Sequence, residues 1–446
     1  MMSEVKRLDI GEVEWTIEDL QKTLGTTIKF DDTIKTILFL TCLLTYTDSE
    51  QTNVFMTGET CAGKTYDVKE VLWYYPKEDI LVYHGASPTS FFHAPDVVWV
   101  DGETLEPIDM SLKPSRKASM LEKKAWREKL SKGILLRDLS RKIVVFFDMP
   151  HMKLLENLRA VLSHDSKICY YSITDRSERS GLRTKRVGVK GFFVCLFCSA
   201  STFLDEQEAS RNYLLTPETT EEKIKACLDL QAQENANPDF HFWKETEMTR
   251  VLLRERVAQI KSRKINEVFI DYPLETVLRE WFEKQLLHGY KPKDHRDMPR
   301  LRALAKASAL LNFDTRKLED HKDKKILWVN EKDVQNAIRL YSDIVKSNEL
   351  GLSPEAYDVW VKIVKPIISD RGLTVSDVHK RYWSVFKRRG NDRRLRDMLK
   401  SYAQSGLCVE TKEGKMLKYY DIPQEDENKM IPQDQDQKLD SFEGEC

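Results

Sequence analysis

Short apolar runs separated by amphipathic segments dominate the first half of the chain. Residues 31–48 open with two aspartates and continue as an apolar segment, which predicts a buried helix. Several later runs are apolar at every position, as is typical of strands covered on both faces of a parallel sheet. The alternation of such strands with helices predicts an α/β fold with a parallel sheet. The predicted strands are residues 53–57, 80–83, 142–147, 192–197 and 212–215, with helices at 64–73 and 152–162.

The pattern changes outside this core. An insertion ahead of the 142–147 strand holds a short strand at 97–100 and a charged helix near 115–131. Residues 219–347 have nearly uniform helical periodicity, as in a lid packed on a core. From Ser353 three short helices precede two strand candidates. These strand candidates are residues 407–411 and 416–420.

Composition narrows the class of protein. The chain has 446 residues, 41% of them hydrophobic, which is enough for packed cores in two or three domains. A formal net charge of −1 argues against a surface that is basic all over and binds polyanions everywhere, so any basic surface has to be local. Eight cysteines in a chain of this length indicate a reducing interior rather than a disulfide framework.

No segment of the sequence predicts membrane insertion or secretion. The first residues have no apolar leader, and the longest apolar stretch, 37–44, is far shorter than the roughly 20 residues that span a bilayer. We therefore expect a soluble protein, cytoplasmic or nucleoid-associated, with no membrane partner. Residues 424–446 hold eight acidic residues against two lysines and are predicted to be disordered.

A phosphate-binding motif lies between the first predicted strand and the helix after it. Its backbone N–H groups would hold phosphates, Lys64 would contact the β/γ oxygens, and Thr65 would ligate Mg²⁺. A chance glycine-rich turn is the alternative, which the strand–loop–helix order disfavours. The motif predicts ATP and Mg²⁺ as cofactors. Its residues are Gly58, Glu59, Thr60, Cys61, Ala62, Gly63, Lys64 and Thr65.

Asp148 follows four apolar residues, where a Walker B aspartate would bind the metal. The alternative is an aspartate that only ends a strand. Many such ATPases carry a water-activating glutamate next, but here the residue is Met149. The catalytic base is therefore open, and Glu59 and Glu156 are the candidates.

Residues 167–190 contain seven Lys or Arg and two acidic residues, with strand-like flanks around a turn-like Arg-Ser-Gly. This pattern predicts a basic β-hairpin, which would grip phosphates through Arg183, Lys185 and Arg186. A solvated loop is the alternative.

Polar residues follow the 192–197 strand at the edge where a γ-phosphate sensor would lie. Ser199 and Ser201 are the sensor candidates, and Arg211 is the candidate arginine finger for a neighbouring subunit. A surface salt bridge is the alternative for Arg211. Cys195 and Cys198 form a CxxC, but strand spacing points them to opposite faces and disfavours a metal site.

With these parts in order, residues 31–345 resemble the AAA+ ATPases. The hairpin ahead of the sensor strand is similar to that of the pre-sensor-1 hairpin group, which includes minichromosome-maintenance and superfamily-three helicases. The resemblance implies that Ser199 or Ser201 is sensor 1, that Arg211 is the finger, and that Arg296 or Arg300 in the lid contacts the γ-phosphate. A basic amphipathic helix is the alternative for the last two. By this comparison the sequence departs from full-size minichromosome-maintenance proteins, which have a large N-terminal DNA-binding domain, and it lacks the Walker B glutamate.

The segment from Ser353 resembles a winged helix, with a net charge of +6 over residues 353–423. Its helix and wing would contact DNA phosphates, and a protein-binding winged helix is the alternative. The basic residues concerned are Arg393, Arg394, Arg396, Lys400, Lys412 and Lys415.

These expectations combine into an ATP-driven motor. We predict a ring-forming homo-oligomer that translocates on single-stranded or forked DNA as a replicative-type helicase of a mobile element or virus. An AAA+ initiator or loader and a nucleotide-gated scaffold are the alternatives. The predicted domains are an ATPase core at 1–218, a helical lid at 219–350, a winged helix at 351–423 and an acidic tail at 424–446.

Overall fold

The computed structural model describes residues 14–422 except 88–90, 93, 116, 176–182, 200–210, 287–288, 291, 293, 370, 388 and 414–415. The chain divides into two compact units, which meet in sequence after Trp360. Among the described residues, no helix combines the length and apolarity needed to cross a membrane. The predicted acidic tail lies outside the described residues, as do Ser201 and Lys415.

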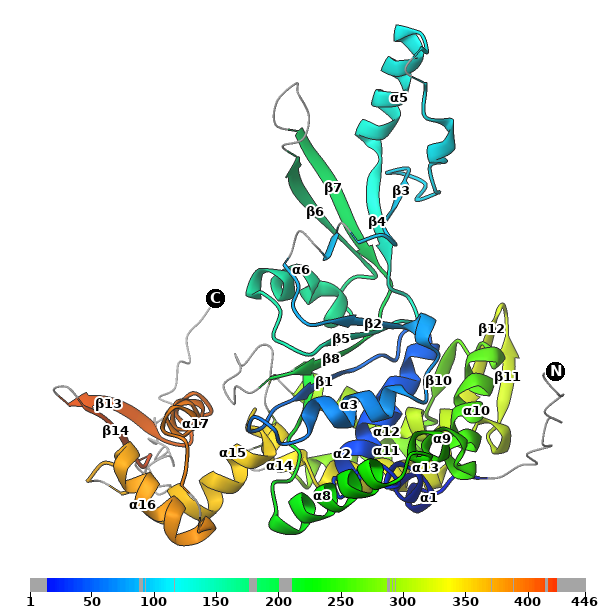
Figure 1. Ribbon diagram of the computed structural model, residues 1–446. Helices are drawn as coiled ribbons and strands as arrows, with labels where there is room; N and C mark the ends of the chain where they lie inside the picture. Colours follow the sequence, from blue (N-terminus) through cyan, green and yellow to red (C-terminus); the bar gives the residue numbers. More distant parts are fainter. Residues whose placement is uncertain are drawn as a thin grey trace, which may run out of the picture. The chain divides into compact units, whose positions relative to one another are not determined.

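The first unit contains a five-stranded sheet in which all neighbouring strands are parallel (Figure 1). The strand order is β2-β5-β8-β1-β9, so β8 lies between β1 and β5. The prediction of an α/β fold with a parallel sheet is confirmed. The five strands are β1 (Asn53–Met56), β2 (Ile80–Tyr83), β5 (Ile143–Phe146), β8 (Val194–Cys198) and β9 (Asn212–Leu215).

Alternate side chains of these strands enter two separate apolar cores. On one face, Met56 and Leu196 pack with α2 (Asp32–Leu43), α3 (Lys64–Leu72) and the later helices. On the other face, Phe55, Phe146 and Phe197 stack, with ring centroids 5.5 and 5.9 Å apart, and pack with α6 (Met152–Leu162). The sheet is thus covered on both sides, which explains why its strands are apolar throughout.

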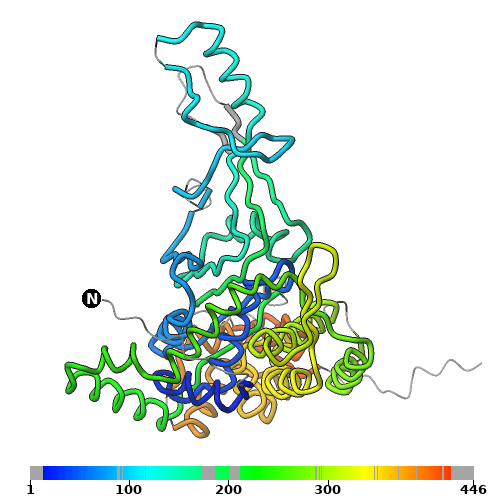
Figure 2. The backbone as a smooth tube through the Cα atoms, turned by 90° about the vertical axis from the view of Figure 1, so that its right-hand side faces the viewer, coloured from blue at the N-terminus to red at the C-terminus, as the bar shows by residue number. Residues whose placement is uncertain are grey.

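A second sheet of four strands, β3-β4-β7-β6, extends away from the first (Figures 1 and 2). Its strands β6 (Ile168–Asp175) and β7 (Arg183–Lys190) pair antiparallel, from Ile168 opposite Lys190 to Asp175 opposite Arg183. The predicted hairpin is therefore present. Its base is anchored by Cys169, Val187 and Val189, which are buried against α6.

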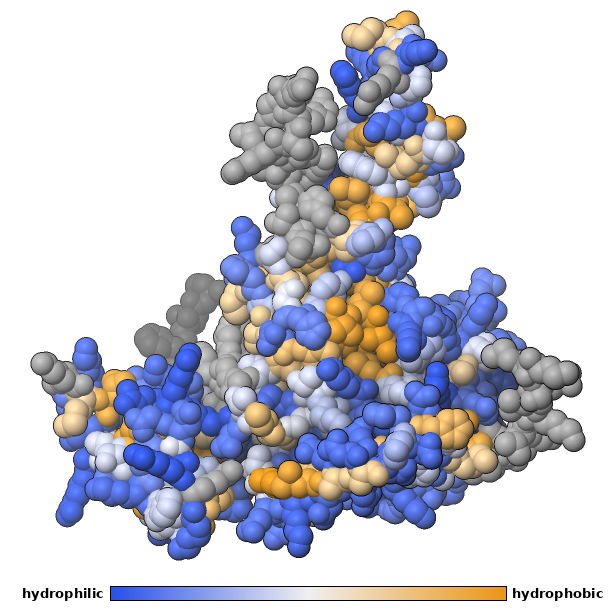
Figure 3. Space-filling model, in the orientation of Figure 1, coloured by the Kyte–Doolittle hydropathy of each residue, from blue (hydrophilic) through white to orange (hydrophobic). Residues whose placement is uncertain are grey.

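The insertion supplies β3 (Val98–Val100), β4 (Ile134–Asp138) and α5 (Met120–Lys132). Strand β4 was not predicted; it pairs with β3 on one side and with β7 on the other. Helix α5 has no buried residue, and Met120 and Leu121 at its start are about 80% exposed. Apolar side chains are visible at this end of the unit in Figure 3.

The segment after β9 packs closely on the core rather than standing apart, because α12 (Asp294–Leu311) contacts both α2 and α13 (Glu331–Ser342). Residues 219–347 are not nearly all helical, because three short strands form a further sheet, β10-β12-β11. These strands are β10 (Glu267–Phe269), β11 (Leu318–His321) and β12 (Lys324–Trp328). The remaining helices are α1 (Ile17–Leu24), α8 (Glu221–Ala236), α9 (Phe240–Thr246), α10 (Met248–Arg263), α11 (Tyr272–Glu283), α14 (Val345–Glu349) and α15 (Pro354–Val359).

Among its described residues, the second unit contains most of a π-helix (Trp360–Val364), two α-helices and a pair of antiparallel strands. Helix α16 (Val375–Phe386) packs on α17 (Asp392–Gln404), and β13 (Val409–Glu413) pairs antiparallel with β14 (Met416–Tyr420). Leu373 joins the hairpin edge through two backbone hydrogen bonds with Tyr419, of 2.7 and 3.0 Å. The core contains Val378 and Tyr382 of α16, and Leu395 and Leu399 of α17.

Candidate nucleotide-binding site

The loop between β1 and α3 encloses the ammonium group of its own lysine. Lys64 is the first residue of α3 and is only 9% exposed. Its Nζ donates to the backbone carbonyls of Gly58, at 2.8 Å, and Glu59, at 2.6 Å. Gly58 and Gly63 have φ of 145° and 99°, which a residue with a Cβ rarely adopts. The loop therefore brings a cation to a helix N-terminus, where unpaired backbone N–H groups favour anions.

The other loop residues leave the site open. Thr60, Cys61 and Thr65 are exposed, while Glu59 and Ala62 are half-buried. Thr65 follows Lys64 in the first turn of α3.

The ends of three strands meet at the same edge of the sheet. The N–H of Ser199, directly after β8, donates to the carbonyl of Met56 at 2.9 Å. Phe146 of β5 is in register with Phe197 of β8, which places Asp148 two residues beyond the same edge. Asp148 is exposed, while Ser199 is only 9% exposed. The carboxyl edge of the sheet thus holds the loop, the carboxylate and the serine together.

The pKa of the Cys198 thiol depends on the charges around it. Burial raises its pKa to about 12, the positive charge of Lys64 opposes that rise, and Asp67 and Asp148 add to it. Lys64 and Asp148 therefore lie within electrostatic range of one strand end. Cys195 belongs to the opposite core of the sheet, which confirms that the two CxxC sulfurs point to different faces.

The oxygen ligands present suit Mg²⁺ that is also bound by phosphates. Asp148 offers an exposed carboxylate and Thr65 an exposed hydroxyl, both of the hard-oxygen type that Mg²⁺ prefers. Within the described part of the chain, no three His, Cys, Asp or Glu side chains are grouped as a metal cage. Mg²⁺ commonly keeps several waters and few protein ligands, so this sparse set fits it.

A buried charge cluster next to the loop escaped sequence reasoning. Asp67, one turn after Lys64 on α3, is 2% exposed, and burial together with the negative charge of Asp31 raises its pKa well above the ordinary range. Asp31 forms a buried ion pair with Lys223 of α8. A Cβ on Gly63 would lie 3.8 Å from the Asp67 carboxylate and 3.9 Å from Lys223 Nζ. The cluster therefore joins α2, α3 and α8 directly beside the loop of residues 58–65, and the i+3 spacing of Asp67 from Lys64 was its only sequence signal.

The two candidate arginines of α12 occupy different environments. Arg300 is 4% exposed, forms an ion pair with Asp297, and donates to the backbone carbonyl of Asn212 in β9 and to Asn348 Oδ1. Arg296 lies one turn earlier, in the first turn of α12, and is exposed. The guanidinium of Arg300 is thus committed to internal contacts.

Arg211 immediately precedes β9 and is half-buried, with its Nε donating to Ser163 Oγ at 2.5 Å. Residues 200–210, which precede it, lie outside the described residues. Glu156, the second candidate base, is exposed on α6.

The predicted DNA contacts are distributed over both units. In the first unit Arg183, Lys185 and Arg186 lie on β7, and the Arg186 side chain is exposed. In the second unit Arg394 is half-buried on α17. The exposed cations of that unit are Arg393, Arg396 and Lys400 on α17, and Lys412 on β13.

No family model matches the chain, and no curated protein is significantly similar to it.

Proposed function

We propose that the chain is an AAA+ ATPase that binds ATP with Mg²⁺ at the carboxyl edge of the five-stranded sheet. The observation that carries the proposal is the meeting of the Lys64 loop, Asp148 and Ser199 at one edge, with β8 between β1 and β5. In this order Ser199 lies between the Lys64 loop and Asp148, which supports a role for it as the γ-phosphate sensor. Magnesium bound there would neutralise charge on the phosphates.

Each side chain has a proposed role. Lys64 would contact the β/γ oxygens, while Asp148 and Thr65 would hold the metal and its waters. Arg296 is the better candidate for a γ-phosphate contact from the lid, because it is exposed whereas Arg300 is buried and bonded to Asp297, Asn212 and Asn348. Arg211 would act on a neighbouring subunit's nucleotide in a ring of identical chains.

We further propose that ATP turnover drives translocation on single-stranded or forked DNA. The support is the β6–β7 hairpin, which carries the basic residues and leads through residues 191–193 directly into β8. Gly191 makes this connection possible: its φ is 90°, and a Cβ there would collide with Ser140. Movement at the sensor serine can therefore pass along one short connection to the hairpin, a link that an initiator does not need.

The second unit supports the proposal as a winged-helix module. Two packed helices, a β-hairpin and the bridge from Leu373 to Tyr419 match the layout of that fold. Exposed basic residues on α17 and β13 suit contacts with DNA phosphates.

A nucleotide-gated scaffold is the second candidate, and one observation favours it. Met149 takes the place of the water-activating glutamate and is 36% exposed beside Asp148. A protein of this kind would bind ATP and change shape without sustained turnover.

ATP hydrolysis by Lys64→Ala tests the nucleotide site. Loss of the ammonium should reduce turnover by about 10²-fold or more, because charge that builds up on the phosphates is no longer neutralised. Lys69→Ala is the matched control, since Lys69 lies on the same helix but is exposed. Parent-like hydrolysis by Lys64→Ala would exclude the assignment, and absence of hydrolysis in the parent itself would favour the scaffold.

Unwinding of a forked duplex per ATP consumed tests the motor. Replacing Lys185 and Arg186 by alanine should cut strand displacement far more than basal ATP hydrolysis, because the hairpin contacts the strand and not the nucleotide. A control that removes Lys124 and Arg127 from the exposed helix α5 should leave displacement unchanged. Equal displacement by the hairpin variant and the parent would remove the hairpin from the mechanism, and a parent that unwinds no fork would favour an initiator.

A further inference from the structure

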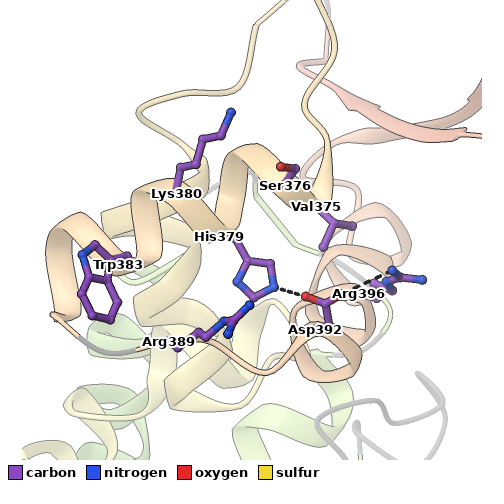
Figure 4. A pocket seen from close by; sticks show the side chains of 8 residues that line it. All are labelled: Val375, Ser376, His379, Lys380, Trp383, Arg389, Asp392 and Arg396. Atoms are coloured by element: carbon purple, nitrogen blue, oxygen red, sulfur yellow. Dashed lines mark hydrogen bonds and ion pairs between the residues drawn. The ribbon is translucent and has the colours of Figure 1, made fainter.

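A groove on the second unit combines an exposed tryptophan with basic side chains. It lies between α16 and α17 and has a volume of about 800 Å³ (Figure 4). Helix α16 supplies side chains spaced three or four residues apart, which lie on one face. The lining residues are Val375, Ser376, His379, Lys380, Trp383, Arg389, Asp392 and Arg396.

Trp383 keeps 58% of its surface exposed although its helix is firmly packed. The preceding residue, Tyr382, is 3% exposed and its ring contacts Phe386 at 4.8 Å. Val378 on the same inward face is completely buried. The backbone of α16 is therefore held in place, and the indole presents a flat apolar face to the groove that the core of the unit does not use.

The charges around the indole favour a polyanion. Lys380, Arg389 and Arg396 line the groove and are exposed. Asp392 is the single carboxylate in the lining; it contacts His379 Nε2 and forms an ion pair with Arg396 (Figure 4). The Arg396 guanidinium compensates the negative charge of Asp392, so the groove as a whole is basic.

We propose that this groove binds single-stranded DNA, with Trp383 stacked on an unpaired base and the three basic residues on neighbouring phosphates. Bases inside a duplex are stacked on each other and offer no face to the ring, whereas an unpaired base does. The inference rests on the proposed action on DNA and gives the second unit a ligand different from the duplex major groove that α17 alone would suggest.

Binding to the full chain without nucleotide tests the proposal. The probes are a fluorescent oligothymidine of about 15 nucleotides and a blunt duplex of comparable length, followed by anisotropy. Trp383→Ala should weaken oligothymidine binding by about tenfold, because the variant has no ring on which a base can stack. Trp383→Phe should retain most of the affinity, and duplex binding should change by less than about twofold in both variants. Trp243→Ala is the control, since Trp243 is 41% exposed on α9 of the first unit.

A second measurement examines the basic residues that would bind phosphates. Replacing Lys380 and Arg389 by alanine should reduce the slope of log affinity against log salt by about 0.7 for each phosphate that is no longer neutralised. Unchanged oligothymidine affinity in Trp383→Ala, or an equal weakening on single-stranded and duplex probes, would overturn the proposal. The assay contains no ATP, so a failure of the groove is distinguishable from a failure of the proposed ATPase, which Lys64→Ala tests separately. Circular dichroism should be the same for all variants because the replaced side chains are exposed.

Discussion

Arg300→Ala should destabilise the first unit rather than only impair nucleotide contacts. The guanidinium and the Asp297 carboxylate are both at most 5% exposed, and the guanidinium also donates to the carbonyl of Asn212 in β9. Removing one partner of such a pair leaves the other charge buried and uncompensated, which typically costs about 3–5 kcal/mol. Arg296→Ala should cost less than about 0.5 kcal/mol in stability, because Arg296 is exposed.

Urea unfolding followed by circular dichroism, together with ATP turnover, separates the two residues. If Arg296 is the lid contact to the γ-phosphate, Arg296→Ala should lose turnover while its unfolding curve matches the parent. The double variant Arg300→Ala/Asp297→Ala should recover part of the stability that Arg300→Ala lacks, because no buried charge is then left unpaired. An Arg300→Ala protein within about 1 kcal/mol of the parent would refute the structural role. In that case a loss of turnover would restore Arg300 as the phosphate contact.

The proposed roles of other charged side chains are open to direct tests. Arg211→Ala should lower ATP turnover by about 10³-fold yet keep nucleotide binding. Mixing Arg211→Ala subunits with Lys64→Ala subunits should restore some activity. If confirmed mixed rings stay inactive, a role of Arg211 on a neighbouring subunit's nucleotide is excluded. Glu59→Gln and Glu156→Gln test the two candidates for the water-activating base. The variant that removes the base should have a kcat about 10²–10⁴-fold lower at unchanged ATP affinity. A parent-like kcat in both variants would place the base elsewhere. Burial lowers the pKa of His164 from 6.5 to about 4. As the pH falls, His164 is therefore protonated in the unfolded chain before it is protonated in the folded one. The free energy of unfolding should consequently fall by about 3 kcal/mol between pH 6.5 and 4. Urea unfolding of His164→Asn should lack that part of the pH dependence, and an unchanged pH profile would contradict the explanation.

The five-stranded sheet was predictable because burial on both faces makes its strands apolar throughout, a signal that needs no knowledge of neighbours. Strand β4 was not predicted because Arg137 and Asp138 interrupt its apolar run. Arg137 is nevertheless 2% exposed, paired with Asp96 and stacked over the ring of Phe91 at 4.7 Å. A buried cation of this kind is tolerated only when distant residues supply its partners, so no local pattern reveals it.

The sheet formed by β10, β11 and β12 was missed for a related reason. Strand β11 consists of Leu-Glu-Asp-His, which is a poor strand sequence by itself, and β10 has only three residues. Both are strands because they pair with β12, and Glu267 of β10 pairs with Ile326 of β12, which lies 59 residues later in sequence. Pairing between distant segments thus overrides weak local preference.

The same distinction between local pattern and distant partner applies to the two candidate arginines of α12. Arg296 and Arg300 are four residues apart on α12 and so lie on nearly the same helix face, which means that periodicity cannot separate them. They differ in what lies opposite: Arg300 faces β9 and Asn348, whereas the Arg296 side chain, in the first turn, is exposed. A basic stripe on a helix therefore indicates which face carries cations. What packs opposite each position decides which cation stabilises the fold and which can reach a ligand. Because the hydroxyl of Tyr213 also donates to the carbonyl of Arg300, a shift of α12 that brought Arg300 to a phosphate would break contacts with β9 at both the backbone and the side chain. The lower-cost route to a γ-phosphate contact is a rearrangement confined to the first turn of α12, which moves Arg296 and leaves Arg300 in place.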